Sequence, residues 1–153
     1  MASSSTLNIW EYLADVEKDK LSAELRSLTD IEQALTGLEA SVDKMQEMKN
    51  EYLAKLNHSD SSLEITVVEL TTSVNFIGRI EEALRHSAAR KIELNQQLRQ
   101  AKQRCADRQI EVKKYVMLGD KDLKANALKL RREEQKQADQ QAAIHWVQRE
   151  SNS

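Results

Sequence analysis

Hydrophobic residues recur every seven positions along most of this 153-residue chain, and no proline interrupts them. A sustained seven-residue repeat keeps its apolar stripe facing a partner only when helices supercoil around one another. In the first half, one position of the repeat is held by Leu7, Ala14, Leu21, Leu28, Leu35, Val42, Lys49 and Leu56. The companion position, three residues later, is held by Trp10, Glu17, Glu24, Ile31, Leu38, Met45 and Tyr52. The pattern predicts a coiled-coil helix over about residues 6–57.

The second half repeats in the same way. Its first position is held by Leu63, Leu70, Ile77, Leu84, Lys91, Leu98, Cys105 and Val112, and its companion position by Ile80, Leu94, Ala101 and Tyr115, with Ser87 and Arg108 as weak points. The β-branched stretch "EITVVELTTSV" favours a short strand as the local alternative. The seven-residue spacing favours a helix there, so we predict a second helix over about residues 62–148.

Between the two repeats, the segment "NHSDSS" at residues 57–62 is the only interior cluster of turn-forming residues. "SSLE" supplies a capping box for the second helix, with Ser61 as the cap and Glu64 three residues later. A link this short favours antiparallel neighbours, so the sequence predicts an all-α fold: one domain, residues 1–153, forming a long antiparallel two-helix coiled coil.

The two predicted helices differ in length by roughly 30 residues, or about 50 Å. The second helix is therefore expected to lose its partner from about Tyr115 onward. Gly119 is expected to loosen the helix in that region, since glycine costs about 1 kcal/mol relative to alanine.

Charge is distributed unevenly, although the net charge is only −2. Residues 1–89 hold 8 basic and 16 acidic side chains, whereas residues 90–136 hold 14 basic and 7 acidic. The basic stretch is either a solvated helix face that pairs partly with the acidic first helix or a surface that docks on an acidic partner. Nucleic-acid binding is not expected, because the basic block carries part of the heptad repeat itself instead of preceding it.

No pattern in the chain indicates catalysis. The three glycines are too far apart for a phosphate-binding loop, and His58, His86 and His145 do not stand at metal-ligand spacing with Cys105. Cys105 occupies an inward heptad position, which predicts a buried structural thiol. We therefore expect no enzyme activity, no metal, no cofactor and no small-molecule substrate. The absence of a long apolar span or a signal-peptide pattern predicts a soluble, intracellular protein.

Phe76 does not fit the core pattern, because it adjoins Ile77 and only one of two consecutive helix residues faces the seam squarely. With Ile77 inward, a line beside the seam contains Phe76, either Arg79 or Ile80, Ala83 and Ser87. Phe76 is either an exposed contact for a partner or a residue that merely flanks the seam.

Three segments resemble a known family: "LADVEKDKLSAEL" near the start, "MQEMKNEYLAKLN" before the turn and "FIGRIEEAL" after it, and the tail "KQADQQAA" is also similar. They resemble the FliJ family of the bacterial flagellar type III export apparatus. The resemblance implies an antiparallel coiled coil like the central stalk of rotary ATPases. It also implies a stalk role: insertion into the export ATPase hexamer, promotion of its assembly, contact with the export gate membrane protein and handling of export chaperones.

The resemblance also assigns roles to residues. It implies export-gate contact by Phe76, Ile80, Ala83 and Ser87, where Ser87 departs from the family pattern, and an exposed partner patch at Ser41, Met45, Met48 and Tyr52. The heptad pattern instead places Met45 and Tyr52 in the seam, so the two interpretations conflict there. Within the basic stretch, the expected ATPase-facing residues are Lys113, Lys114, Lys124, Arg131 and Arg132.

The alternatives are a stalk from a virulence type III secretion system, a helical export chaperone, or a generic coiled-coil oligomeriser. The stalk role implies a cytoplasmic location, with peripheral association at the inner face of the cell membrane.

Overall fold

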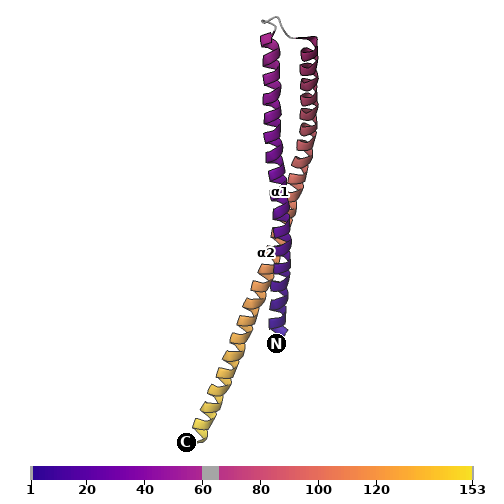
Figure 1. The fold of residues 1–153 in the computed structure, drawn as a ribbon. Helices are drawn as coiled ribbons and strands as arrows, with labels where there is room; N and C mark the ends of the chain where they lie inside the picture. The colour runs from indigo at the N-terminus through magenta and orange to yellow at the C-terminus, as the bar shows by residue number, and fades with distance from the viewer. Residues whose placement is uncertain (1, 60–65, 153) are drawn as a thin grey trace. The chain divides into compact units, whose positions relative to one another are not determined.

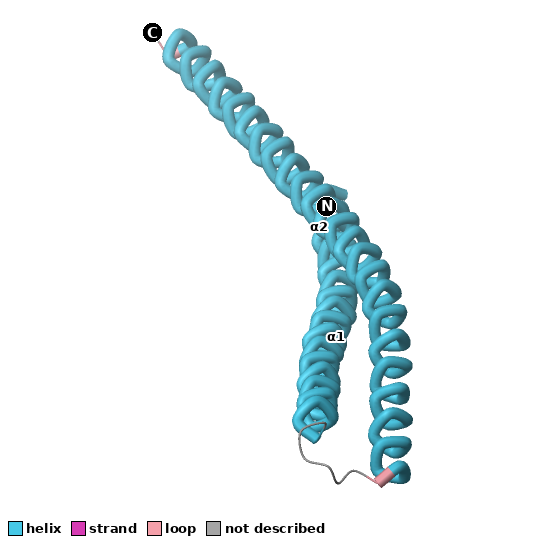
Figure 2. The backbone as a smooth tube through the Cα atoms, turned by 90° about the horizontal axis from the view of Figure 1, so that it is seen from above, coloured by secondary structure: helices cyan, strands magenta, loops and turns pink. Residues whose placement is uncertain are grey.

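The computed structural model of the chain describes residues 2–59 and 66–152, with the side chains of residues 9–57 and 66–152. In these residues the chain forms two α-helices, α1 (Ala2–Ser59) and α2 (Val67–Ser151), and no strand (Figures 1 and 2). The predicted all-α class with two long helices is confirmed. The β-branched stretch from Val67 onward is helical, and the hydroxyls of Thr71 and Thr72 donate to the carbonyl oxygens of Val67 and Val68 at 2.7 and 2.8 Å.

The chain divides into two compact units, which we call unit 1 (Met1–Ser22 with Ala106–Ser153) and unit 2 (Ala23–Cys105). Within each unit, a segment of α1 pairs with a segment of α2 in the antiparallel direction. In unit 2, cross-helix contacts join Glu24 to Arg104, Glu39 to Lys91, Lys49 to Glu81 and Tyr52 to Phe76. As the residue number on α1 rises from 24 to 52, the number of its partner on α2 falls from 104 to 76. Antiparallel pairing requires this order.

The seam of unit 2 follows the predicted heptads. On α1, every residue of the two heptad positions from Leu28 to Leu56 is buried or half-buried. On α2 the buried side chains are Ile77, Ile80, Leu94, Ala101 and Cys105. Complete burial of an aliphatic side chain contributes about 1.5–3 kcal/mol, so this stripe is the main source of stability in the unit. Two predicted members lie outside it: Leu70 is 45% exposed, and the exposed Lys91 reaches sideways to Glu39.

Ion pairs flank this seam. The side-chain nitrogens of Lys49, Lys91 and Arg104 lie 3.3, 3.6 and 2.8 Å from the carboxylates of Glu81, Glu39 and Glu24. In two of the three pairs the acid comes from α1 and the base from α2, as the uneven charge distribution predicted. Exposed pairs of this kind contribute about 0–1 kcal/mol each, so they select the pairing partner more than they stabilise it.

The helix ends differ from the prediction. α1 continues through Asn57 to Ser59, which the sequence had assigned to the turn, and α2 begins at Val67 instead of about residue 62. Thr66 caps α2: the backbone N–H of Glu69 donates to its hydroxyl at 3.3 Å, and that of Leu70 to its carbonyl at 3.1 Å. "TVVE" has the same Thr-x-x-Glu spacing as the predicted box "SSLE", so two equivalent signals competed. Ser61, Leu63, Glu64 and the side chains of Leu7 and His58 lie outside the described residues.

Candidate partner-binding surfaces

An aromatic pair joins the two helices of unit 2 close to the residues that connect them. The ring centroids of Tyr52 and Phe76 lie 4.6 Å apart with the planes tilted by 39°, and the ammonium of Lys55 stands 5.5 Å from the Tyr52 ring. Both aromatic side chains are half-buried. The structure therefore joins one residue from each of the two predicted sets, the gate-contact line and the α1 patch.

The rest of the predicted gate-contact line lies toward the seam. Ile80 is only 6% exposed, so it has little surface left for a partner while the helices are paired. Ala83 and Ser87 are half-buried. Ser87 and Ala88 have small side chains, and a groove of about 340 Å³ lies beside them along Leu38, Val42 and Leu84.

The predicted α1 patch is split in the same way. Met48 is exposed, whereas Met45 and Tyr52 are half-buried in the heptad stripe. Ser41 is exposed. The heptad interpretation therefore describes the positions of Met45 and Tyr52, and Ser41 and Met48 are the members of the patch that are open to a partner.

In unit 1, Trp10 holds α1 against α2. Its indole N–H donates to the carboxylate of Asp122 at 2.6 Å, and its ring stacks on Tyr115 with the centroids 6.1 Å apart. A Cβ at Gly119 would stand 3.5 Å from the Cβ of Trp10, so the glycine lies at a close approach of the two helices. In the described part of the chain no residue has a positive φ, glycines included. The helix α2 therefore passes through Gly119 without a break.

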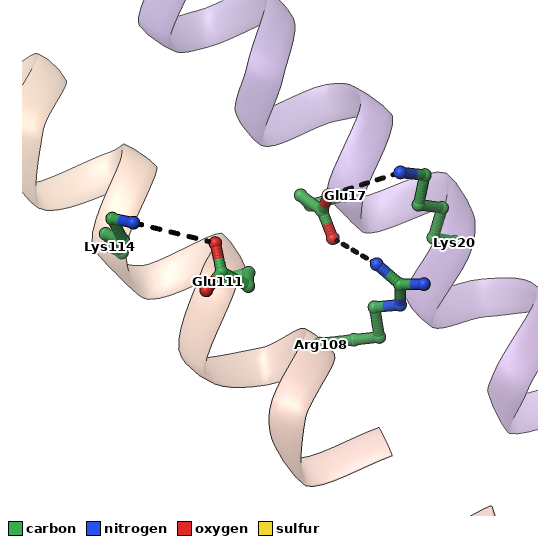
Figure 3. A network of polar contacts seen from close by, with 5 residues as sticks. All are labelled: Glu17, Lys20, Arg108, Glu111 and Lys114. Atoms are coloured by element: carbon green, nitrogen blue, oxygen red, sulfur yellow. Dashed lines mark hydrogen bonds and ion pairs between the residues drawn. The ribbon is translucent and has the colours of Figure 1, made fainter. Parts of the chain in front are cut away.

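A charged pair occupies the seam of unit 1. Arg108, a predicted weak point of the heptad, donates to Glu17 at 3.1 Å, and the ammonium of Lys20 lies 3.5 Å from the same carboxylate (Figure 3). Glu17 is only 9% exposed. Polar side chains therefore occupy inward positions here, and Glu17 is more deeply buried than the polar heptad residues of unit 2, Glu24 and Lys49.

The predicted ATPase-facing cations all lie on the solvent-exposed surface of α2 in unit 1: Lys113, Lys114, Lys124, Arg131 and Arg132. Lys114 lies 3.9 Å from Glu111 on its own helix (Figure 3). Its ammonium also lies 5.7 Å from the centroid of the Tyr115 ring. Among the described residues, the other four form no ion pair.

The end of α2 has no partner helix within the described part of the chain. Every residue from 127 to 152 is exposed, whereas Asn126 is still half-buried. The loss of pairing was predicted from about Tyr115. It begins later because α1 starts at Ala2 and Trp10 reaches Asp122. Large apolar side chains are exposed along this segment: Leu128, Leu130, Ile144, Trp146 and Val147.

A family model described as the flagellar FliJ protein matches residues 11–151, which is nearly the whole chain. The chain belongs to the FliJ family. No curated protein and no solved structure matches it at a significant level.

FliJ proteins are non-catalytic components of the flagellar protein export apparatus, so this FliJ-family chain is a component of that apparatus and takes part in flagellum biogenesis. The match covers both helices and the segment between them. The expected resemblance is thereby confirmed at the level of the family.

Three further observations concern the chemistry of this FliJ-family chain. Cys105 is a buried free thiol in the seam of unit 2, as predicted. Among the side chains of residues 9–57 and 66–152, no group of three or more His, Cys, Asp or Glu could hold a metal ion. In the same ranges, neither helix has a stretch long and apolar enough to cross a membrane.

Proposed function

We propose that this chain is the stalk of the flagellar export apparatus, which inserts into the export ATPase hexamer, promotes its assembly and links it to the export gate. The observation that carries the proposal is the end of α2, where residues 127–151 form a helix exposed on every side. Most helices in proteins owe their stability to packing of an apolar face rather than to propensity alone. The exposed Leu130, Ile144 and Trp146 are therefore expected to pack against another protein.

A truncation tests the ATPase contact. Deleting residues 127–153 removes the unpartnered segment but keeps Asp122, which accepts the hydrogen bond from Trp10, and Asn126, the last half-buried residue of α2. Because every residue from 127 to 152 is exposed, we expect unchanged melting of the remaining chain and at least about tenfold weaker binding to the purified ATPase. Binding is measured by pull-down and titration, and circular dichroism shows whether the helices remain. A truncated chain that binds as tightly as the full chain would contradict the proposal.

For the gate contact, we propose the surface around the Tyr52–Phe76 pair, with the half-buried edges of Ala83 and Ser87. Aromatic side chains that are half-buried keep one face for a partner, and aromatics dominate the energetics of many interfaces. Ile80 supports this surface from the seam instead of touching the partner directly, because it is buried.

Phe76→Ala tests this contact. The change removes one ring of the pair, so we expect at least about tenfold weaker binding to the cytoplasmic part of the gate protein, with little loss of helix content. Val74→Ala is the matched control, since Val74 is 54% exposed and lies two residues away. Equal gate affinity for both variants, measured by titration, would count against the aromatic pair.

We also assign chaperone handling to the α1 patch. Met48 is its exposed methionine, and the half-buried Met45 and Tyr52 lie beside it. Methionine suits a surface that receives several partners, because its flexible thioether adapts to different shapes. The proposed location is the cytoplasmic face of the cell membrane, reached through the gate.

A further inference from the structure

Between residues 110 and 132, one face of α2 in unit 1 carries apolar and basic side chains and no acidic ones. Successive residues of an α-helix are rotated by about 100°, so Ile110, Met117 and Leu128 fall within about 20° of one line along the helix. Within about 60° of that line lie six cations: Lys113, Lys114, Lys121, Lys124, Arg131 and Arg132. We call these nine residues the basic stripe.

The acidic residues of the same stretch lie elsewhere on the helix. Glu111 and Asp120 fall on the flanks, and Asp122 faces α1, where it accepts the hydrogen bond from Trp10. In Figure 3, Arg108 points toward α1 while Glu111 and Lys114 pair along α2 itself. The basic stripe therefore has one sign of charge although acidic residues stand close to it in the sequence.

The three apolar members of the stripe are exposed, at 63% for Ile110, 70% for Met117 and 50% for Leu128. The seam residues of this part of α2, such as Val112, Tyr115 and Gly119, lie on the opposite face. Pairing with α1 leaves the stripe open, so a partner reaches it without separating the helices. The stripe also extends past Asn126 into the segment that α1 does not cover.

We propose that the basic stripe is the surface of α2 that docks onto the export ATPase, a proposal that rests on the stalk function proposed above. The matching surface would carry carboxylates around separate apolar sockets. At 1.5 Å per residue, the sockets for Ile110, Met117 and Leu128 would stand about 10 and 16 Å apart. The cations speed encounter and set the orientation, and the three apolar side chains supply most of the affinity.

The distribution of side chains favours an acidic protein surface over a membrane. Lys121 and Lys124 interrupt the apolar line between Met117 and Leu128. An amphipathic helix that lies in a bilayer interface needs a continuous apolar face, which this stripe lacks. Separate sockets in a folded protein accept isolated apolar side chains without that requirement.

A pair of leucines offers a matched test in the full-length chain. Leu128 lies on the stripe and Leu130 on the opposite face, and they are 50% and 59% exposed. Leu128→Ser is expected to weaken ATPase binding by about tenfold, and Leu130→Ser by less than about threefold. Both changes have the same cost in helix propensity, and circular dichroism checks that both variants stay folded.

Charge is tested in the same way. Lys121→Glu reverses the charge at a position on the stripe. Lys129→Glu reverses the charge at an exposed position about 100° away from the line through Ile110, Met117 and Leu128. We expect Lys121→Glu to lower the association rate at about 50 mM salt, with a smaller effect at about 300 mM, and Lys129→Glu to change it little.

The outcomes separate the stripe from the stalk function. Full-length chain that does not bind the ATPase would refute both. ATPase binding that falls equally in the Leu128 and Leu130 variants would leave the stalk function standing and overturn the one-sided stripe. A third outcome is that the full-length chain binds vesicles containing anionic lipid, and that Leu128→Ser loses this binding but binds the ATPase normally. That outcome would assign the stripe to a membrane and overturn the proposal.

Discussion

Single residues explain why the helices of unit 1 lie close together. Gly119 on α2 faces the Cβ atom of Trp10 on α1. The indole of Trp10 is held in place by its hydrogen bond to Asp122. The sequence alone suggested that this glycine loosens α2. The structure gives it an ordinary helical conformation, as it does Gly37 and Gly78.

Gly119→Ala is expected to stabilise the protein. A methyl group would meet the Cβ of Trp10 at 3.5 Å, an ordinary van der Waals distance, and alanine has the higher helix propensity. We expect the free energy of unfolding to rise by about 0.5–1 kcal/mol, measured by urea denaturation.

Gly78→Ala is the control for this change, since no atom lies within 4 Å of its added Cβ. It should give a similar gain from helix propensity alone. A loss of stability confined to Gly119→Ala would show that the close approach tolerates no side chain.

At the level of the helices, the two seams differ in chemistry. Unit 2 is held mainly by aliphatic layers, with Glu24 and Lys49 half-buried among them, whereas unit 1 contains the Glu17–Arg108 pair and the Trp10–Asp122 hydrogen bond at inward positions. Polar groups in a coiled-coil seam often specify register at a cost in stability. The first part of α1 is therefore expected to be aligned by directional contacts more than by burial.

A double-mutant cycle measures that contribution. Arg108→Ala leaves the nearly buried Glu17 with Lys20 as its remaining cationic neighbour, so we expect a loss of about 1–2 kcal/mol and a coupling energy of about 1 kcal/mol or more with Glu17→Ala. Urea denaturation of the two single variants and the double variant gives the coupling.

The Lys91–Glu39 pair is the control cycle, because both of its side chains are about half exposed. Its coupling should be near zero. Equal coupling in the two cycles would mean that burial adds nothing to the Glu17–Arg108 pair.

The course of the helices was predictable because a long repeat of fixed period leaves few alternatives. Every heptad position of α1 from Trp10 to Leu56 is buried or half-buried, including Glu17 and Glu24. Helix ends were harder to predict, since Ser61 and Thr66 each precede a glutamate by three residues, and local spacing does not decide between equivalent caps.

For the molecule as a whole, the sequence predicted the family and the charge relation between the helices, but not the contacts within the candidate sites. The sequence assigned Phe76 and Tyr52 to two separate sets, and their ring contact depends on a register that the turn and the seam determine together. The exposure of Met48 and the burial of Ile80 follow from the same register. Partners lie beyond what a single chain determines, so the gate and ATPase contacts stay proposals.

The two tryptophans stand in environments that a spectrometer can tell apart. Trp10 is half-buried against Tyr115, whereas Trp146 is 61% exposed near the end of α2. Indole emission shifts to shorter wavelength in apolar surroundings, so the chain contains two natural optical reporters. In a Trp146→Phe background, emission follows the fraying of α1 from α2. In a Trp10→Phe background, it follows the arrival of a protein at the end of α2, and neither measurement needs an attached dye.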